Sequence, residues 1–210
     1  MSDRKRKGRL VVISAPSGAG KTTLVHKLIE QEPDFVFSVS YTTRKPRETE
    51  TPGADYHFVS KSEFLALRDR GEFLEYAEVF DNFYATGRRA VEGQLNAGKH
   101  VIVEIDWQGA RQVRERMPEC RSIFIVPPSI EALESRLRNR RTDSPEVIAR
   151  RLRDSLLDLS HWREFDYIVV NDDLDAALLE LTGIATGRLR RNRIGTKATA
   201  RIMARILGNA

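Results

Sequence analysis

Residues 10–22 read LVVISAPSGAGKT, and this stretch decides the fold. A β-branched apolar run leads into a loop that matches the phosphate-binding pattern G-x-x-x-x-G-K-[ST], except that Ala15 stands at the first glycine. Glycines let consecutive backbone N–H groups turn toward phosphate oxygens. The following TLVHKLIEQ is typical of a helix, whose N-terminus attracts anions. We therefore predict a nucleoside triphosphate site, formed by Ala15, Pro16, Ser17, Gly18, Ala19, Gly20, Lys21 and Thr22.

Two of these side chains carry specific chemistry. The Lys21 ammonium would reach the β- and γ-phosphates, and the Thr22 hydroxyl would hold Mg²⁺. A glycine turn that merely joins a strand to a helix is the alternative. This alternative accounts for the glycines. It does not account for a lysine and a threonine at the positions that the phosphate-binding pattern requires.

Length and composition restrict the class of protein. The chain has 210 residues, enough for one domain with a small inserted subdomain. No apolar stretch reaches the length of a membrane span, and the first ten residues lack the apolar centre of a signal peptide. The single cysteine, Cys120, cannot form an intrachain disulfide, so we expect a cytoplasmic location and a structural thiol. The four histidines show no metal-ligand spacing.

The net charge of +5 is unevenly distributed. Residues 1–9 carry five basic side chains and one acidic, and residues 188–210 carry seven basic side chains and no acidic ones, so residues 10–187 are net acidic at −6. Such tails could touch nucleic acid, but no aromatic residues interleave for base stacking. We therefore expect solvated tails and no nucleic-acid partner. Within the second tail, TKATARIMARIL is typical of an amphipathic helix that packs on the body or on a partner subunit, which leaves a homo-oligomer open.

The alternation of strand-like and helix-like segments predicts an α/β fold with a largely parallel sheet. The expected strands are 10–14, 35–39, 101–105, 122–126 and 167–170. An α+β insertion is expected over about 38–90, with short strands at 56–59 and 72–80. Residues 129–160 predict two helices broken at 142–145, which would form a movable lid. The domain would span 10–187, with a basic tail at 1–9 and a basic extension at 188–210.

A second anion site is predicted in the segment 38–56, SVSYTTRKPRETETPGADY. Arg44 and Arg47 flank a proline, a spacing that could aim two planar guanidiniums at one phosphate. Tyr56 and Tyr84 could donate phenolic hydroxyls to the same group. A solvated basic loop is the alternative interpretation.

The stretch VIVEIDWQG at 101–109 is an apolar strand that ends in two acids, the usual form of a Walker B strand. Asp106 could contact Mg²⁺ directly or through water. Glu104, two residues earlier on the same strand face, could turn to the substrate. Capping of the following helix is an equally good explanation of Asp106.

Taken together, these motifs resemble the guanylate kinase family. They occur in the family's order: the phosphate-binding loop, SVSYTTRKPR, GADYHFV, EFLEYAEVFDNFYATG, EIDWQGA, SRLRNRRTDSPEVIARR and YIVVND. The resemblance covers residues 8–187. It implies ATP-dependent phosphorylation of GMP, and of dGMP, to the diphosphate, with Mg²⁺ accompanying ATP. The fold it implies is a P-loop NTPase core with a GMP-binding insertion and a helical lid.

The resemblance also assigns roles to individual residues. Arg44, Arg47, Tyr56 and Tyr84 would grip the GMP phosphate, and Ser40, Glu75, Thr86 and Glu104 would surround the guanine. Arg136, Arg140 and Arg151 match lid arginines that stabilise the transferring phosphoryl group, and Asn171 matches a position that contacts adenine. The implied catalytic residues are Lys21, Arg44, Arg140 and Arg151. Arg138, Arg141, Arg150 and Arg153 would face solvent or pair with nearby acids.

Guanine chemistry supports the role of Glu75 independently. The guanine edge presents N1–H and N2–H₂ donors and the O6 acceptor, so a carboxylate accepts from both donors while Ser40 or Thr86 donates to O6. Adenine would set its unprotonated N1 against the carboxylate and leave a buried charge unpaired. A solvated strand glutamate is the alternative.

The sequence departs from the family pattern at four positions. Ala15, Ala85 and Arg141 replace glycines, and Glu104 replaces an aspartate, which puts the local geometry in question but not the reaction class. Three other functions stay open: a kinase for another phosphorylated small molecule, a non-catalytic module that binds phosphorylated peptides, and nucleic-acid binding through the tails. The intact Gly20-Lys21-Thr22 argues for catalysis.

Overall fold

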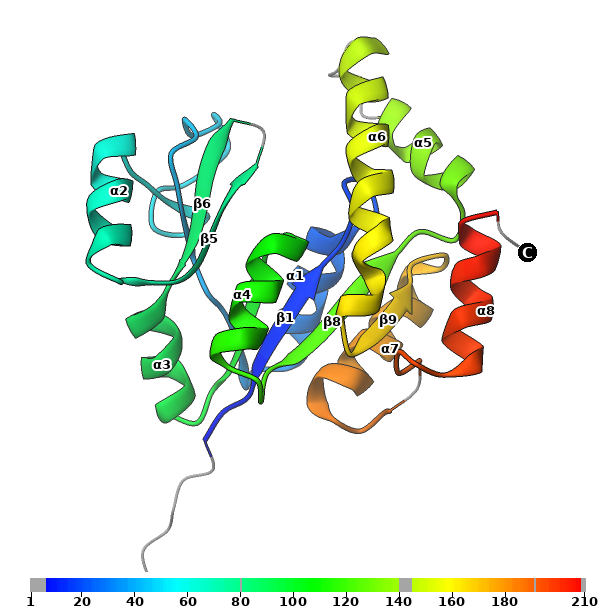
Figure 1. Ribbon diagram of the computed structural model, residues 1–210. Coiled ribbons are helices and arrows are strands. Elements are labelled where there is room, and N and C mark those ends of the chain that lie inside the picture. Colours follow the sequence, from blue (N-terminus) through cyan, green and yellow to red (C-terminus); the bar gives the residue numbers. More distant parts are fainter. Residues whose placement is uncertain (1–6, 80, 140–144, 191, 209–210) are drawn as a thin grey trace, which may run out of the picture. The chain divides into compact units, whose positions relative to one another are not determined.

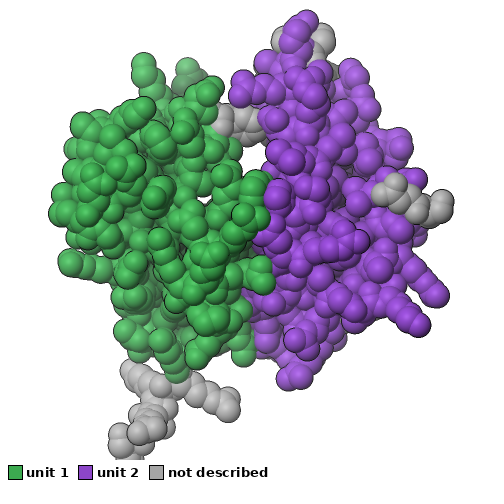
Figure 2. Space-filling view, in the orientation of Figure 1, with its two compact units in different colours: residues 1–12, 33–120 green, residues 13–32, 121–210 purple. Residues whose placement is uncertain are grey.

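The computed structural model describes residues 7–79, 81–139, 145–190 and 192–208. The chain divides into two compact units, which we call unit 1 (Met1–Val12 and Pro33–Cys120) and unit 2 (Ile13–Glu32 and Arg121–Ala210) (Figure 2). The elements in chain order (Figure 1) are β1 (Leu10–Ser14), α1 (Lys21–Gln31), β2 (Phe35–Phe37), β3 (Ser40–Thr42), β4 (Tyr56–Phe58), α2 (Lys61–Asp69), β5 (Phe73–Val79), β6 (Asn82–Gly87), α3 (Arg88–Asn96), β7 (His100–Glu104), α4 (Trp107–Arg116), β8 (Arg121–Val126), α5 (Ile130–Arg138), α6 (Pro145–Ser160), the 3₁₀ turn η1 (His161–Glu164), β9 (Tyr167–Val170), α7 (Leu174–Thr186) and α8 (Lys197–Ile206).

The strands form two sheets, with the orders β2-β7-β1-β8-β9 and β4-β3-β6-β5. In the first sheet, β2 pairs with β7 and β8 pairs with β9, both in parallel. Strands of parallel sheets are buried on both faces, which explains the uninterrupted apolar runs of β7 and β8. The α/β class and the five strands expected from the sequence are confirmed, with boundaries that differ by up to two residues.

The second sheet lies within unit 1, where α2 covers one of its faces (Figure 1). Phe64 of α2 is fully buried and clusters with Phe73 and Ala85 from the sheet. Helix α2 begins with a capping box, because Ser60 Oγ accepts from the Glu63 N–H at 3.2 Å and the Glu63 carboxylate accepts from the Ser60 N–H at 2.8 Å. The face turned away from α2 carries buried polar side chains, among them Ser40, Thr42 and Thr86.

The basic C-terminal extension is built into unit 2. The Ile168 N–H donates to the Asn192 carbonyl at 3.1 Å, and the Ile194 N–H donates to the Asp166 carbonyl at 2.9 Å. Helix α8 follows, with Thr199, Met203 and Ile206 buried at helical spacing. The amphipathic helix expected from the sequence is therefore present. The expectation of a solvated tail is wrong for residues 192–208, because β9 offers a strand edge for 192–194 and α8 has an apolar stripe to bury.

Across the described helices, none has the length and apolar character needed to span a membrane.

Candidate active site

The phosphate-binding loop of unit 2 joins β1 to α1 as the sequence predicts. Gly18 and Gly20 both adopt φ of +88°, a left-handed conformation that side chains rarely adopt. Gly20 is also the N-cap of α1 and provides no side-chain hydrogen bond, so the first turn of α1 lacks a side-chain cap. An N-terminus of this kind binds anions through its N–H groups and its dipole.

Two distant side chains fix the orientation of this loop. Asn171 Nδ2, just after β9, donates to the Ala19 carbonyl at 2.7 Å, and Ser155 Oγ of α6 donates to the Ser17 carbonyl at 3.2 Å. Because C=O and N–H point in opposite directions across a planar peptide, these bonds turn the N–H groups of Gly18 and Gly20 away from the protein interior. The loop is therefore held in a shape suited to phosphate.

Asn171 thus has a partner other than the expected adenine. Its side chain is only 6% exposed, and a Cβ on Gly20 would lie 2.3 Å from its Nδ2 atom. A side chain at position 20 would therefore collide with the amide that supports the loop. Gly20 is needed for this close approach as well as for its φ.

The other loop residues lie where the motif requires. Pro16 and Ala19 are buried, Lys21 begins α1 and Thr22 is exposed on its first turn. Ala15 is not among the described non-glycine residues with positive φ, so this position does not need the glycine of the family pattern. Ala85 likewise fits its place, because it is fully buried in the cluster beneath α2.

The expected lid is anchored to unit 2 at several points. Leu133 and Leu137 of α5 are buried, and their side chains lie 3.1–3.3 Å from the point that a Cβ on Gly18 would occupy. Arg136 Nη2 donates to the Asn171 carbonyl at 2.9 Å. Its Nη1 is buried without a hydrogen-bond partner, which leaves one donor for an anionic ligand.

The remaining lid arginines differ in their surroundings. Arg138 is exposed and pairs with Glu134 at 2.6 Å, as expected for a solvent-facing residue. Arg151 lies half-buried on α6. Arg140 and Arg141, together with the break expected at 142–145 up to residue 144, lie outside the described residues.

In unit 1, the expected guanine-binding residues line up across the four-stranded sheet. Ser40 pairs with Tyr56 on one side and with Thr86 on the other, and Thr86 pairs with Glu75. Directly opposed residues in neighbouring strands project to the same face, so all four side chains share one face. Tyr84, two residues before Thr86, joins them there. This face is the one opposite α2.

A β-bulge brings Glu75 to this face. Phe73 pairs with Gly87, but Glu75 pairs with the adjacent Thr86, so two steps along β5 match one step along β6. Without that extra residue, Glu75 would share the face of Phe73 and point into the core beneath α2. Hydrophobic periodicity does not signal this change of face.

Glu75 is the most perturbed group of the site. Its side chain is buried, with the residue only 2% exposed, and Oε1 accepts a hydrogen bond from Thr86 Oγ1 at 2.6 Å. The pKa of Glu75 is raised to about 7, chiefly by burial and to a smaller extent by the Asp106 charge, while hydrogen bonds from Thr86 and the charge of Arg116 oppose the shift. Gly109 of α4 makes room for the carboxylate, because a Cβ there would lie 2.4 Å from Oε2.

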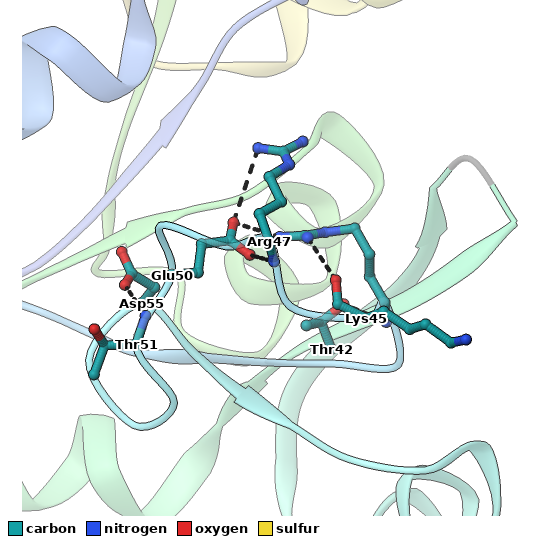
Figure 3. A network of polar contacts seen from close by, with 7 residues as sticks. Thr42, Lys45, Arg47, Glu50, Thr51 and Asp55 are labelled. Atoms are coloured by element: carbon teal, nitrogen blue, oxygen red, sulfur yellow. Dashed lines mark hydrogen bonds and ion pairs between the residues drawn. The ribbon is translucent and has the colours of Figure 1, made fainter.

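The two arginines that were expected to bind phosphate, Arg44 and Arg47, converge on Glu50, which sequence reasoning did not single out. Arg44 Nη2 donates to Glu50 Oε1 at 2.7 Å, and the Arg47 N–H donates to Glu50 Oε2 at 2.8 Å (Figure 3). The hydrogen bond to Glu50 raises the pKa of Arg44, and the bond from Arg44 lowers the pKa of Glu50. The Arg47 side chain is 70% exposed and reaches Glu50 only at 3.8 Å.

Two tyrosines complete this region. The Arg44 guanidinium lies 5.4 Å from the centre of the Tyr56 ring, and the Tyr56 and Tyr84 rings meet edge to face at 6.1 Å. Burial raises the pKa of Tyr56, with a further contribution from the Glu104 charge, so its hydroxyl stays protonated and can donate.

The acids at the end of β7 require a correction. Glu104 is the last residue of the strand and half-buried, but Asp106 lies beyond it as the N-cap of α4. The two side chains therefore do not share a strand face. Asp106 Oδ1 accepts from the Gly109 N–H at 2.8 Å, and its Oδ2 accepts from Gln108 Nε2 at 3.1 Å, so Asp106 caps α4.

Comparisons with known proteins agree with this geometry. The family model described as guanylate kinase matches residues 7–186. The chain belongs to the guanylate kinase family. It is 54% identical over 184 residues to the guanylate kinase of Alkalilimnicola ehrlichii, covering 88% of this chain and 91% of that protein, and 49% identical over 201 residues to that of Vibrio cholerae, covering 94% and 97%.

A solved structure of the family gives the same result. The crystal structure of guanylate kinase from Anaplasma phagocytophilum superposes with a TM-score of 0.73 at 34% sequence identity, covering 94% of this chain and 95% of that one. The P-loop NTPase fold expected from the sequence is confirmed.

The raised pKa of Glu75 predicts a pH-dependent stability. The folded state keeps a proton that the unfolded chain, with a pKa near 4.5, has lost, so this stabilisation is complete below about pH 4.5 and disappears as the pH rises through about 7. Relative to Glu75→Gln, the free energy of unfolding should fall by about 3 kcal/mol between pH 4.5 and pH 8. Urea unfolding of both proteins at a series of pH values measures this, and parallel curves would contradict it.

Proposed function

We propose that the chain transfers the γ-phosphoryl group of ATP to the phosphate of GMP, giving ADP and GDP, with the residue roles described below. The activity follows from membership of the family. The observation that carries the roles is the polar row on the face of the second sheet opposite α2, which ends at the buried carboxylate of Glu75.

Guanine would be read by hydrogen bonds to that row. Glu75 would accept from N1–H and N2–H₂ as a carboxylate. The Thr86 hydroxyl already donates to Glu75, so Ser40, its neighbour in the row, would be the hydroxyl that donates to O6. Glu104 would lie at the margin of the base. None of these contacts involves the ribose 2′-hydroxyl, so dGMP should also be accepted.

The phosphate of GMP would be held by Arg44, Arg47, Tyr56 and Tyr84. Arg44 is preoriented, because Glu50 holds one of its nitrogens and the Lys45 carbonyl accepts from another at 2.8 Å. Arg47 extends into solvent and would close on the phosphate when GMP arrives. A preorganised fork beside two phenols suits a doubly charged phosphate.

ATP would bind through the loop at 15–20 and the first turn of α1. The N–H groups and Lys21 would neutralise the β- and γ-phosphates, and the unpartnered Nη1 of Arg136 would donate to the nucleotide. No general base is needed, because the attacking phosphate oxygen of GMP is already anionic near pH 7. Catalysis then rests on in-line positioning and on neutralising charge.

Guanylate kinases use ATP and generally need a divalent metal, and we propose Mg²⁺ here. In the part of the chain that is described, no three His, Cys, Asp or Glu side chains form a metal cluster. This fits Mg²⁺, which binds through one or two protein oxygens and substrate phosphates. Thr22 would hold the ion, and the metal contact expected of Asp106, directly or through water, stays a prediction. When bound, Mg²⁺ neutralises charge on the phosphate oxygens.

Other expectations from the sequence stay predictions. These are the insertion, lid and tail boundaries, a cytoplasmic location, the absence of a nucleic-acid partner, the open question of a homo-oligomer, and the catalytic role of Arg140, which lies outside the described residues.

A nucleotide panel tests the function and the role of Glu75 together. ADP release with GMP, dGMP, AMP, CMP and UMP should show activity with the two guanine nucleotides. In Glu75→Gln, the amide sets an NH₂ group against the donors of guanine, so kcat/KM for GMP should fall by roughly 2–4 kcal/mol while KM for ATP hardly changes. Equal losses for both substrates would indicate damaged folding, and no loss would place guanine recognition elsewhere.

Removing the Lys21 ammonium should abolish most of the turnover. Lys21→Met deletes a preorganised charge at the γ-phosphate, so kcat should drop by at least about 100-fold while the affinity for GMP changes little. Lys27→Met, on the same helix but away from the loop, is the matched control and should remain active. Steady-state kinetics would refute the assignment if Lys21→Met kept normal turnover.

The lid arginines should act on the transition state. Arg151→Ala should lower kcat more than it raises KM for either nucleotide, and Arg151→Lys should restore activity only in part, because a point charge cannot replace the planar fork. Arg138→Ala removes an exposed pair with Glu134 and should be tolerated. If kinetics show both alanine variants equally impaired, the choice of Arg151 is wrong.

A further inference from the structure

Helix α4 directs one face toward β5 around Glu75. Gly109, Gln112 and Arg116 follow each other at i, i+3 and i+7, a spacing that places them on one side of a helix. Each of them meets a different part of β5 between Phe73 and Tyr76. Because β5 is an edge strand of its sheet, its outer backbone groups have no further strand to pair with.

Gln112 pairs with backbone groups of the residue after Glu75, in the place of a neighbouring strand. Its Nε2 donates to the Tyr76 carbonyl at 2.6 Å, and its Oε1 accepts from the Tyr76 N–H at 3.3 Å. A single side-chain amide thus pairs with both backbone groups of one residue, as a neighbouring strand would. The backbone directly after Glu75 is fixed by this pair of bonds.

Arg116 holds the backbone on the other side. Its Nη1 donates to the Leu74 carbonyl and lies 3.5 Å from the Phe73 carbonyl. Leu74 is the residue inserted where the register of β5 shifts, so Arg116 binds the carbonyl of the bulge itself. The bulge is what turns Glu75 from the core face to the guanine face.

Gly109 is the third residue on this face of α4, and it contributes by having no side chain. A Cβ there would lie 2.4 Å from Glu75 Oε2 and 3.0 Å from the carboxyl carbon. The carboxylate therefore rests directly against the first turn of α4. Any side chain at this position would push the carboxylate out of its place.

We propose that Gln112 and Arg116 are positioning residues for guanine specificity, which hold the bulge of β5 so that both carboxylate oxygens of Glu75 face the base. The inference rests on the proposed function, in which Glu75 reads guanine. It adds that this reading depends on two residues of α4 that touch neither substrate. The surrounding sheet alone does not determine where the carboxylate lies.

The chemistry of IMP offers a selective test. Hypoxanthine keeps N1–H and O6 of guanine but lacks the N2 amino group, so the ratio of kcat/KM for GMP to that for IMP reports the second hydrogen bond to Glu75. General damage to the protein lowers both values and leaves the ratio unchanged. A displaced carboxylate lowers the ratio.

Four variants make the experiment. Arg116→Met keeps the stem but removes the donors, and Gln112→Ala removes the amide. Each should lower the GMP to IMP ratio about 10-fold, the effect expected when about one hydrogen bond is lost, with KM for ATP unchanged. Arg116→Lys retains a donor for the Leu74 carbonyl and should preserve most of the ratio. Arg114→Met, the same substitution two residues away on α4, is the matched control and should keep the full ratio.

Glu75→Gln separates the two levels of the proposal. If Glu75→Gln collapses the ratio and the two α4 variants do not, positioning by α4 is wrong and the role of Glu75 stands. If Glu75→Gln leaves the ratio intact, the proposed guanine contact and the inference both fail. In the double variant Glu75→Gln with Arg116→Met, the effect of Arg116→Met on the ratio should vanish, and full additivity would also overturn the inference.

Discussion

The arrangement of unit 1 depends on burying one carboxylate, that of Glu75, where one hydroxyl, that of Thr86, donates to it. Removing Glu75 from water favours its protonated form, and one hydroxyl from Thr86 cannot offset that effect. The bulge in β5, the bare backbone of Gly109 and the polar row from Tyr56 to Thr86 all serve to keep the group at this position. In the proposed function, a base with two adjacent N–H donors would satisfy the carboxylate, and a base with an acceptor there would leave its charge unpaired. The cost of burying this carboxylate would then be the physical basis of the proposed specificity for guanine.

Unit 2 has a different electrostatic requirement, because its loop must attract a large negative charge largely through backbone groups. Its loop is tied by its carbonyls to Asn171 and Ser155, so the peptide dipoles present their positive ends. Arg136 adds a buried donor atom that has no protein partner. In unit 1, by contrast, the Arg44 guanidinium already has a protein anion, Glu50, as a partner. In the proposed function, the phosphate of GMP would therefore share Arg44 with Glu50 or displace Glu50, whereas ATP would meet the unpartnered Nη1 of Arg136.

The sequence predicted what depends on local pattern. The loop glycines, the apolar parallel strands, the helix at 197–206 and the two arginines around Pro46 follow from spacing and residue type, and the structure contains them. The sequence could not predict features that depend on the register between strands. The bulge at Leu74 adds one residue to β5 and thereby moves the Glu75 side chain to the opposite face of the sheet. Hydrophobic periodicity does not encode such an insertion. The same holds for partners far away in sequence. The sequence offers no local signal for the bond from Asn171 to Ala19. Asp106 looked like a strand residue because it directly follows the apolar run that reaches Ile105, whereas β7 ends at Glu104 and Asp106 is the N-cap of α4.

The ties of the phosphate-binding loop also bear on how the chain acquires its structure during synthesis. The bonds from Ser155 to Ser17 and from Asn171 to Ala19 span 138 and 152 residues, so they close only after most of the chain has left the ribosome. At a synthesis rate of about 5–20 residues per second, roughly 8 to 30 s separate the synthesis of the loop from that of Asn171, which forms its second stabilising hydrogen bond. The four-stranded sheet needs only residues 40–87 and is synthesised well before that. A nascent chain should therefore form its four-stranded sheet first, and the loop encoded near its beginning should be among the last parts to become rigid.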